Sequence, residues 1–161
     1  MSVREAAEEL VTRAAAAGRR GRVLTSDEAS MLTDEVTGYP GWLAELLAQV
    51  PLCGLELGWP EPELGEPQWL EWADANAAKS ESVEFYPGLA ILPAGYVNVA
   101  ADAGGGSDPF FISVHEGPDP ALYQIYHDVG SEAEDILRDG RKLVAPSLSA
   151  FFKSALIRPK G

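Results

Sequence analysis

The chain has 161 residues, 46% of them hydrophobic, and a formal net charge of −13 at pH 7. This length and composition suit one domain with a continuous core, so we expect a single domain over residues 1–161. No stretch reaches the roughly 18 uninterrupted apolar residues that span a bilayer, the N-terminus lacks the apolar run of a secretory signal, and the single cysteine forms no internal disulfide. We therefore expect a cytoplasmic protein with no membrane partner.

The negative charge is concentrated in the middle of the chain. Residues 1–22 carry five Arg and three Glu, and residues 138–161 carry six Lys or Arg and one Asp. Between them, residues 23–137 hold 21 Asp or Glu and one base, Lys79, which gives this segment a net charge of −20. Such a field repels nucleic acid and anionic lipid and speeds the encounter with a basic protein. The charge is consistent either with a surface that keeps the protein soluble or with a docking surface.

Three helices are predicted in the first third of the chain. Ala and Glu dominate residues 3–17, where apolar residues recur with a period near 3.6, and Gly18 ends this helix. With the arginines that follow, it forms an N-terminal helix and basic segment over residues 1–22. A second short helix begins at Ser26, where acidic residues occupy the first turn. The third begins after Pro40 and has one apolar face.

The middle of the chain begins with a short apolar run at 52–57 that suits a strand. Three prolines then interrupt residues 58–67, so this acidic segment is predicted to be an exposed loop. A helix is predicted over residues 68–79, and residues 80–87 are predicted to be irregular.

Short β-type runs separated by turn residues dominate the next part of the chain. The turn-rich connections at 104–108 and 116–120 favour antiparallel pairing of their neighbours. A charged stretch at 131–139 tolerates a helix, and Pro146 and Ser147 open a closing helix with an apolar face. Helices on both sides of such strands predict an α+β domain with a mainly antiparallel sheet. The predicted strands are 89–92, 96–101, 109–115 and 121–127.

Few residues suggest catalysis. His115 and His127 stand at the ends of predicted strands, and a metal site of His127, Asp128 and Asp119 has no HxH or HExxH spacing to support it. Cys53 lies in an apolar run without a positive neighbour and is predicted to be a small buried hydrophobic residue. We predict no catalytic residue, no metal site and no cofactor. An enzyme or small-molecule binder that uses the acidic loop and the histidines is the least favoured alternative.

Residues 102–108, DAGGGSD, contain a run of three glycines. A phosphate-binding loop would need a lysine or a helix start after the glycines, whereas a β-type Pro-Phe-Phe-Ile segment follows here. Gly104, Gly105 and Gly106 are therefore predicted to supply the backbone freedom of a tight strand connection.

The four tryptophans differ in their surroundings. Trp42 lies on the apolar face of a predicted helix and is assigned to the core. Trp59 stands in the acidic, proline-rich loop, and Trp69 and Trp72 are three residues apart on the next predicted helix. Aromatic residues among carboxylates are typical of a binding hot spot for a basic partner, and burial of these tryptophans in the core is the alternative.

Several stretches together resemble the SUKH superfamily. Residues 95–114, GYVNVAADAGGGSDPFFISV, are similar to a strand that ends in a glycine-rich, Asp-bearing turn and leads to a second strand. Residues 123–128, YQIYHD, resemble the end of the family's third strand, and residues 145–152, APSLSAFF, resemble its closing helix. Residues 39–57 resemble the helix and first strand of some members.

The resemblance implies an α+β domain with a curled sheet and a cleft, flanked by N-terminal helices and a C-terminal helix, with no enzyme activity and with protein partners. Members include a regulator of yeast cell-wall synthesis and bacterial immunity proteins, whose toxin is often encoded nearby. Because nuclease and deaminase toxins tend to be basic, we expect an immunity protein for such a toxin; a general regulatory or scaffold protein of the same fold is the alternative. The expected partner-binding residues are Trp59, Glu61, Glu63, Glu66, Trp69, Trp72, Asp102 and Asp108.

Overall fold

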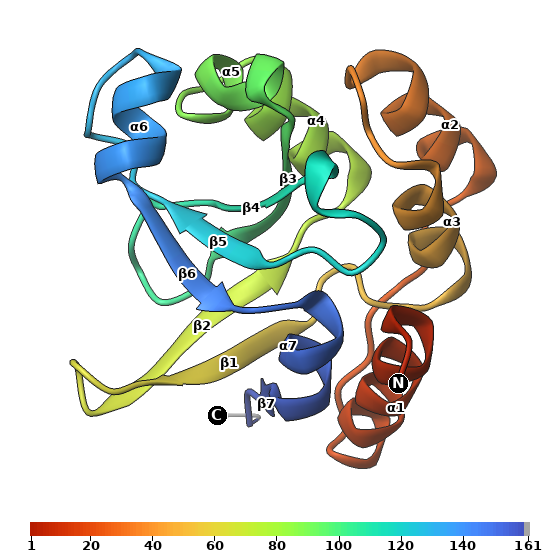
Figure 1. Ribbon diagram of the computed structural model, residues 1–161. Coiled ribbons are helices and arrows are strands. Elements are labelled where there is room, and N and C mark those ends of the chain that lie inside the picture. Colours follow the sequence, from red (N-terminus) through yellow and green to blue (C-terminus); the bar gives the residue numbers. More distant parts are fainter. Residues whose placement is uncertain (160–161) are drawn as a thin grey trace.

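One antiparallel sheet of seven strands organises the chain, in the spatial order β6-β5-β4-β3-β2-β1-β7 (Figure 1). The computed structural model describes residues 1–159, so Lys160 and Gly161 of the basic C-terminal segment lie outside the described residues. The sheet curls into a half-barrel, and the helices surround it, which confirms the predicted α+β class. The strands are β1 Glu56–Glu61, β2 Glu66–Trp72, β3 Tyr96–Asp102, β4 Phe110–Ser113, β5 Leu122–Ile125, β6 Arg141–Ala145 and β7 Leu156–Ile157.

The helices begin where the sequence offers caps. Ser2 and Glu5 form a capping box at the start of α1, and Thr25 and Glu28 form another at the start of α2, so backbone N–H groups that lack helical partners are satisfied. The three N-terminal helices and the closing helix are confirmed. The helices are α1 Val3–Ala16, α2 Ser26–Glu35, α3 Gly41–Gln49, α4 Ala75–Val83, α5 Gly88–Ile91, α6 Ala133–Asp139 and α7 Leu148–Ser154, with 3₁₀ turns at Leu92–Ala94 and Val114–Glu116.

The two faces of the sheet are buried by different helices. The main core packs α1, α2, α3 and α7 against the face that carries Leu57, Leu70 and Phe110. A smaller cluster lies on the other face, where Phe111 and Ile125 pack with residues of α5 and α6. Alternation of side chains along each strand explains the division, because successive residues point to opposite faces.

A buried asparagine sits where β3 departs from regular pairing. The register between β3 and β4 shifts between Asn98 and Ala100. Asn98 Nδ2 donates to the carbonyls of Ala100 and Phe110, at 3.1 Å each, and its backbone N–H donates to Ser82 Oγ. The side chain thus satisfies carbonyls that the bulge leaves without ladder partners.

Three predicted elements are wrong. Residues 58–67 do not form a loop, because they belong to the hairpin of β1 and β2. The second strand of this hairpin also occupies the first part of the region 68–79, where a helix was predicted. The helix of this region is α4, which begins at Ala75 and includes part of the stretch 80–87 that was predicted to be irregular. The apolar run 89–92 is helical rather than a strand, since Leu89 N–H donates to Phe85 O across one turn. A short apolar run without periodicity does not distinguish the two structures.

Arginines of the N-terminal segment hold the C-terminal end of the described chain. α1 and α7 lie side by side (Figure 1), and Arg13 donates to the carbonyls of Phe152 and Ala155, at 2.8 and 2.9 Å. Arg19 donates to Arg158 O at 2.9 Å. The basic ends of the sequence are therefore neighbours in space, and part of their charge serves to join them.

Candidate protein-binding surface

The β1–β2 hairpin projects from the rest of the molecule, at the lower left of Figure 1. The N–H groups of Leu64 and Gly65 both donate to Glu61 O, and Gly65 takes a positive φ of 68°, which closes the turn. Leu64 is 60% exposed at the tip, and the side chains of Glu63 and Glu66 are exposed beside it. The tip therefore presents an apolar side chain between two carboxylates.

Glu61 belongs to the hairpin but not to its exposed surface. Its side chain is 8% exposed, and Glu61 Oε2 accepts a hydrogen bond of 2.6 Å from Lys142 Nζ on β6. This hydrogen bond raises the pKa of Lys142 above its usual value. Glu61 is thus a structural residue, which corrects its assignment to the partner-binding set.

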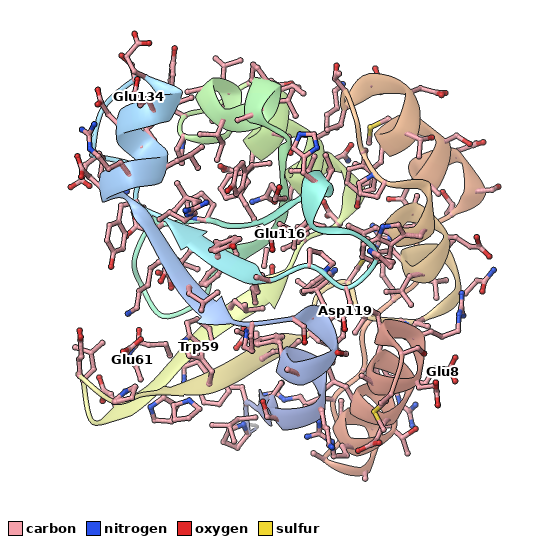
Figure 2. All side chains as sticks on the ribbon, viewed as in Figure 1. Glu8, Trp59, Glu61, Glu116, Asp119 and Glu134 are labelled. Carbon is pink, nitrogen blue, oxygen red and sulfur yellow. The ribbon has the colours of Figure 1, made fainter. Side chains whose placement is uncertain are left out.

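Two of the three candidate tryptophans lie in the core. Trp59 meets Phe110 edge-on at 5.3 Å between ring centroids and lies 6.3 Å from Phe151 of α7 (Figure 2). Trp72 is 1% exposed and lies 5.2 Å from Phe152. The prediction of a binding surface for both tryptophans assumes a loop over residues 58–67 and a helix over residues 68–79. In a strand they follow Leu57 and Leu70 at two-residue spacing and share the core face.

Trp69 is the tryptophan on the outer side of the hairpin. In a strand, residues three apart point to opposite faces, so Trp69 is separated from Trp72. Its ring covers Gly58, where an added Cβ would lie 2.6 Å from the ring, and the guanidinium of Arg158 lies 5.4 Å from the ring centroid. Arg158 also bonds Glu56 at 3.0 Å. A half-buried aromatic residue with a cation on its face remains at this surface.

The glycine-rich turn lies next to Trp69. Ala103 N–H donates to Trp69 O at 3.0 Å, and Ala103 O accepts from Arg158. Asp102 Oδ1 accepts from Gly104 N–H at 2.7 Å, and Gly105 has a φ of 96°, a conformation that favours glycine. Asp102 pairs with Leu70 and not with Trp69, so the side chains of Trp69 and Asp102 belong to opposite faces of the sheet. The turn joins β3 to β4 as the glycines predicted.

Asp108 lies apart from this group and binds His127. Asp108 Oδ1 lies 2.6 Å from His127 Nδ1 and accepts from the His127 backbone N–H at 2.9 Å. The hydrogen bond to Asp108 raises the pKa of His127 above its usual value. This pair ties the end of β5 to the β3–β4 connection.

The residues considered as candidates for catalysis or metal binding do not lie close together. Asp119 accepts from the N–H of Ser149 at the start of α7 and not from His127 (Figure 2). Among residues 1–159, no group of three His, Cys, Asp or Glu is placed to hold a metal ion. Burial raises the pKa of Cys53 to about 11, so the thiol is protonated and a poor nucleophile near neutral pH. The prediction that Cys53 is a buried hydrophobic residue is confirmed.

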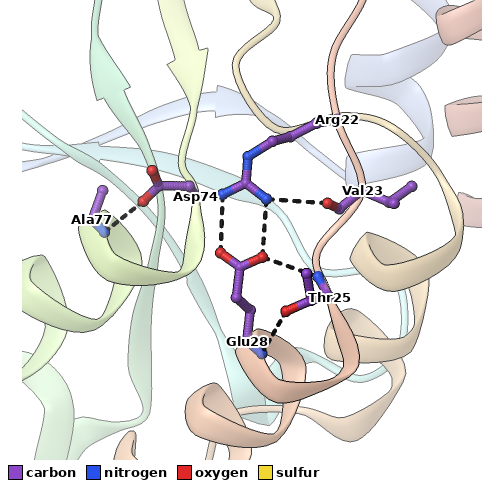
Figure 3. A network of polar contacts seen from close by, with 6 residues as sticks. All are labelled: Arg22, Val23, Thr25, Glu28, Asp74 and Ala77. Carbon is purple, nitrogen blue, oxygen red and sulfur yellow. Dashed lines mark hydrogen bonds and ion pairs between the residues drawn. The ribbon is translucent and has the colours of Figure 1, made fainter.

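The polar network nearest to Cys53 is structural. Arg22 Nη1 and Nη2 donate to the two carboxylate oxygens of Glu28, at 2.9 Å each, while Asp74 accepts from Ala77 N–H and caps α4 (Figure 3). The hydrogen bond to Arg22 lowers the pKa of Glu28 to about 2. These groups fix the segment between α1 and α2 to its neighbours.

A separate hollow of about 400 Å³ lies between the start of α1, α3 and the loop before β5. Val3, Trp42 and Leu46 form its apolar walls, and Arg4 and Glu45 are at its margin. Trp42 is only partly buried, although it packs against the core as its helix face predicted.

Most of the acidic side chains form no salt bridge with a base of the described part of the chain. The salt bridges among residues 1–159 engage eight of the 25 Asp and Glu residues. Glu63 and Glu66 of the hairpin take part in none of them. Lys142 and Arg158, by contrast, are bound to hairpin residues. One feature of the sequence was consistent with this pairing: bases are concentrated at the chain ends and acids in the middle.

The chain was compared with models of protein families, with curated proteins and with solved structures, and none of them matches it. No helix in the described part of the chain is both long and apolar enough to cross a membrane.

Proposed function

We propose that this protein is a non-enzymatic binding domain, which acts in the cytoplasm as an immunity protein and neutralises a basic toxin of the nuclease or deaminase type. The observation that carries the proposal is the projecting hairpin tip, where exposed Leu64 lies between Glu63 and Glu66. An apolar side chain beside exposed carboxylates that form no salt bridge within residues 1–159 suits a partner surface rich in Lys and Arg.

The charge distribution supports a basic partner. Segment 23–137 has a net charge of −20, and the bases at the two ends of the chain are largely engaged in contacts within the fold. A field of this sign speeds diffusional encounter with a cationic protein and would oppose nucleic acid at the same surface. An inhibitor with this charge can occupy the groove in which a nuclease binds its substrate.

The resemblance to the SUKH superfamily supports the immunity role. It rests on residues 95–114, 123–128 and 145–152, which form β3 with its glycine-rich turn and β4, the end of β5, and the start of α7. A curled antiparallel sheet with a closing helix is the kind of fold that the resemblance implies. A regulatory or scaffold protein with the same fold is the second candidate, since the resemblance covers both kinds of member.

A co-expression and capture experiment tests the proposal. We expect protection of cells that express the toxin-like domain encoded beside this chain, and capture of one basic protein in a 1:1 complex from native cells. Changing Glu63 and Glu66 to Gln should slow association at least several-fold. The matched control changes Glu8 and Glu134 to Gln, which removes the same charge from α1 and α6, far from the hairpin (Figure 2).

Two outcomes overturn the proposal. If no basic protein is captured and no neighbouring toxic domain is neutralised, the immunity role is wrong. If a complex forms but the hairpin variant associates as fast as the control variant, the hairpin is not the binding surface.

A further inference from the structure

A second exposed apolar surface lies at the junction of α4 and α5. Phe85 is 55% exposed, Tyr86 52% and Leu89 40%, so three large apolar side chains reach solvent within five residues. Scattered exposed apolar residues are normal on a soluble protein, whereas grouped ones mark interaction sites. In Figure 1 this junction lies at the top of the molecule, at the opposite end from the hairpin tip.

The backbone of this junction is firmly held. Gly88 is buried against the last turn of α4, where an added Cβ would lie within bonding distance of Glu81 O. On its inner side α5 contributes Ile91 to the cluster that also contains Ile136 of α6. The exposed side chains are therefore presented on a fixed scaffold, which lowers the entropy lost when a partner binds.

The charge beside these side chains is negative and lacks compensation. Glu81 and Glu84 stand at the C-terminal end of α4, and its last turn contains no basic residue. The C-terminus of a helix carries a partial negative charge, so carboxylates there are unfavourable unless a cation is near. Burial raises the pKa of Glu81, and neither glutamate forms a salt bridge within residues 1–159. Lys79, the base closest along the chain, is paired with Glu35 at 3.4 Å.

We propose that Phe85, Tyr86 and Leu89 form a docking surface for a basic protein, which places Arg or Lys side chains beside Glu81 and Glu84 and apolar side chains on the exposed trio. A guanidinium can also stack on the two aromatic rings. This surface is distinct from the hairpin and stands whether or not the partner at the hairpin is a toxin.

Two short synthetic peptides provide the probe. Both carry the same number of Arg residues; in one the intervening residues are Leu, and in the other they are Gly and Ser. We expect the Arg-Leu peptide to shift the backbone amide signals of residues 81–91 of the full chain in NMR spectra at about 150 mM salt, where distant charges are screened. The Arg-Gly-Ser peptide should shift them much less.

Variants distinguish peptide binding at this surface from general electrostatic attraction to an acidic protein. Phe85→Ala and the double change Glu81→Gln with Glu84→Gln should each weaken Arg-Leu peptide binding at least fivefold, a loss typical of a central contact residue. Glu63→Gln on the hairpin should leave the shifts at 81–91 unchanged. All these side chains except Glu81 are exposed, and unchanged signals from core residues verify that each variant is folded.

Three results overturn the proposal: equal shifts with both peptides, shifts confined to the hairpin, or wild-type affinity in the Phe85→Ala variant. Concentration-dependent sedimentation that Phe85→Ala abolishes would instead assign the surface to a second copy of the chain. Because hairpin signals are recorded in the same spectra, failure at one surface is distinguishable from failure at the other.

Discussion

Glu61 in β1 and Lys142 in β6 are joined by a hydrogen bond of 2.6 Å, although four strands lie between β1 and β6 in the sheet. The contact is possible only because the sheet curls until its distant strands approach one another. A charged pair thus fixes the curvature at the end of the half-barrel near the hairpin. Removal of the lysine would leave a carboxylate with 8% exposure and no cation.

Lys142→Met should therefore lower the free energy of unfolding by about 2 kcal/mol, the scale for a buried charged group that loses its partner. Urea unfolding of the variant and the wild type measures the difference. Lys79→Met is the matched control, because its salt bridge with Glu35 is solvent-exposed and should contribute less than about 1 kcal/mol. Equal losses in the two variants would show that the Glu61–Lys142 pair has no special role.

The tryptophans of the hairpin should respond differently to truncation. Trp59→Ala removes a buried ring between Phe110 and Phe151 and should cost about 3–5 kcal/mol of unfolding free energy. Trp69→Ala removes a half-buried ring on the outer face and should cost no more than about 2 kcal/mol. Thermal and urea unfolding provide the comparison. A larger loss for Trp69 than for Trp59 would contradict the assignment of the two faces.

Asn98 offers a test of the bulge between β3 and β4. Asn98→Ala leaves the carbonyls of Ala100 and Phe110 without their donor and should cost about 2–4 kcal/mol. Asn98→Asp should be at least as damaging, because its side chain would bring an acceptor toward two acceptors. Urea unfolding of both variants checks this, and a fully tolerated Asp would exclude the donor role of the side chain.

The glycine-rich turn requires a left-handed residue at one position. Gly105 has a φ of 96° and open space where a side chain would go, so Gly105→Val should cost about 1–3 kcal/mol through its backbone alone. Gly41→Ala is the control, since Gly41 also has open space but lies in α3, where alanine should be neutral or stabilising. Differential scanning calorimetry of the two variants compares their stabilities. If Gly105→Val kept full stability but lost partner binding, the turn would be a ligand-contacting loop.

The decrease in the free energy of unfolding at low pH should depend on Glu28. Its pKa is about 2 in the folded chain and ordinarily 4.5, so the unfolded chain binds the proton more tightly between these values. The stabilisation by ionised Glu28 is therefore complete above pH 4.5 and is lost as the pH falls toward 2. Glu28→Gln should flatten the pH dependence of the unfolding free energy in that range relative to the wild type. Parallel curves for the two proteins would contradict it.

The hairpin shows why local sequence rules failed at the candidate site. Prolines at 60, 62 and 67 predicted a loop because each lacks an N–H donor, yet Pro60 and Pro67 face each other across the two strands. Antiparallel pairs alternate between hydrogen-bonded and non-hydrogen-bonded positions, and Trp72 N–H donates to Leu55 O in the same ladder. This alternation places the two prolines at a pair where no donor is needed. Pairing across the hairpin, which composition does not reveal, made the prolines acceptable.

Patterns within one element were predicted more successfully than contacts between elements. Caps and apolar periodicity located α1, α2, α3 and α7, and turn residues located β3, β4 and β5. The partners of the hairpin, Lys142 and Arg158, lie 81 and 102 residues away from Glu61 and Glu56 along the chain. The curl of the sheet brings Lys142 there, and the pairing of β7 with β1 brings Arg158, so no local pattern could assign these bases to the site.

The two arginine contacts that join α1 to the end of the described chain bear on the order of folding. Arg13 lies on the first helix, and the carbonyls that it binds belong to Phe152 and Ala155, more than a hundred residues later. During synthesis, the first helix cannot complete its packing until those residues have left the ribosome. Folding should thus wait for the end of translation of this domain, because contacts so distant in sequence require a large loop to close.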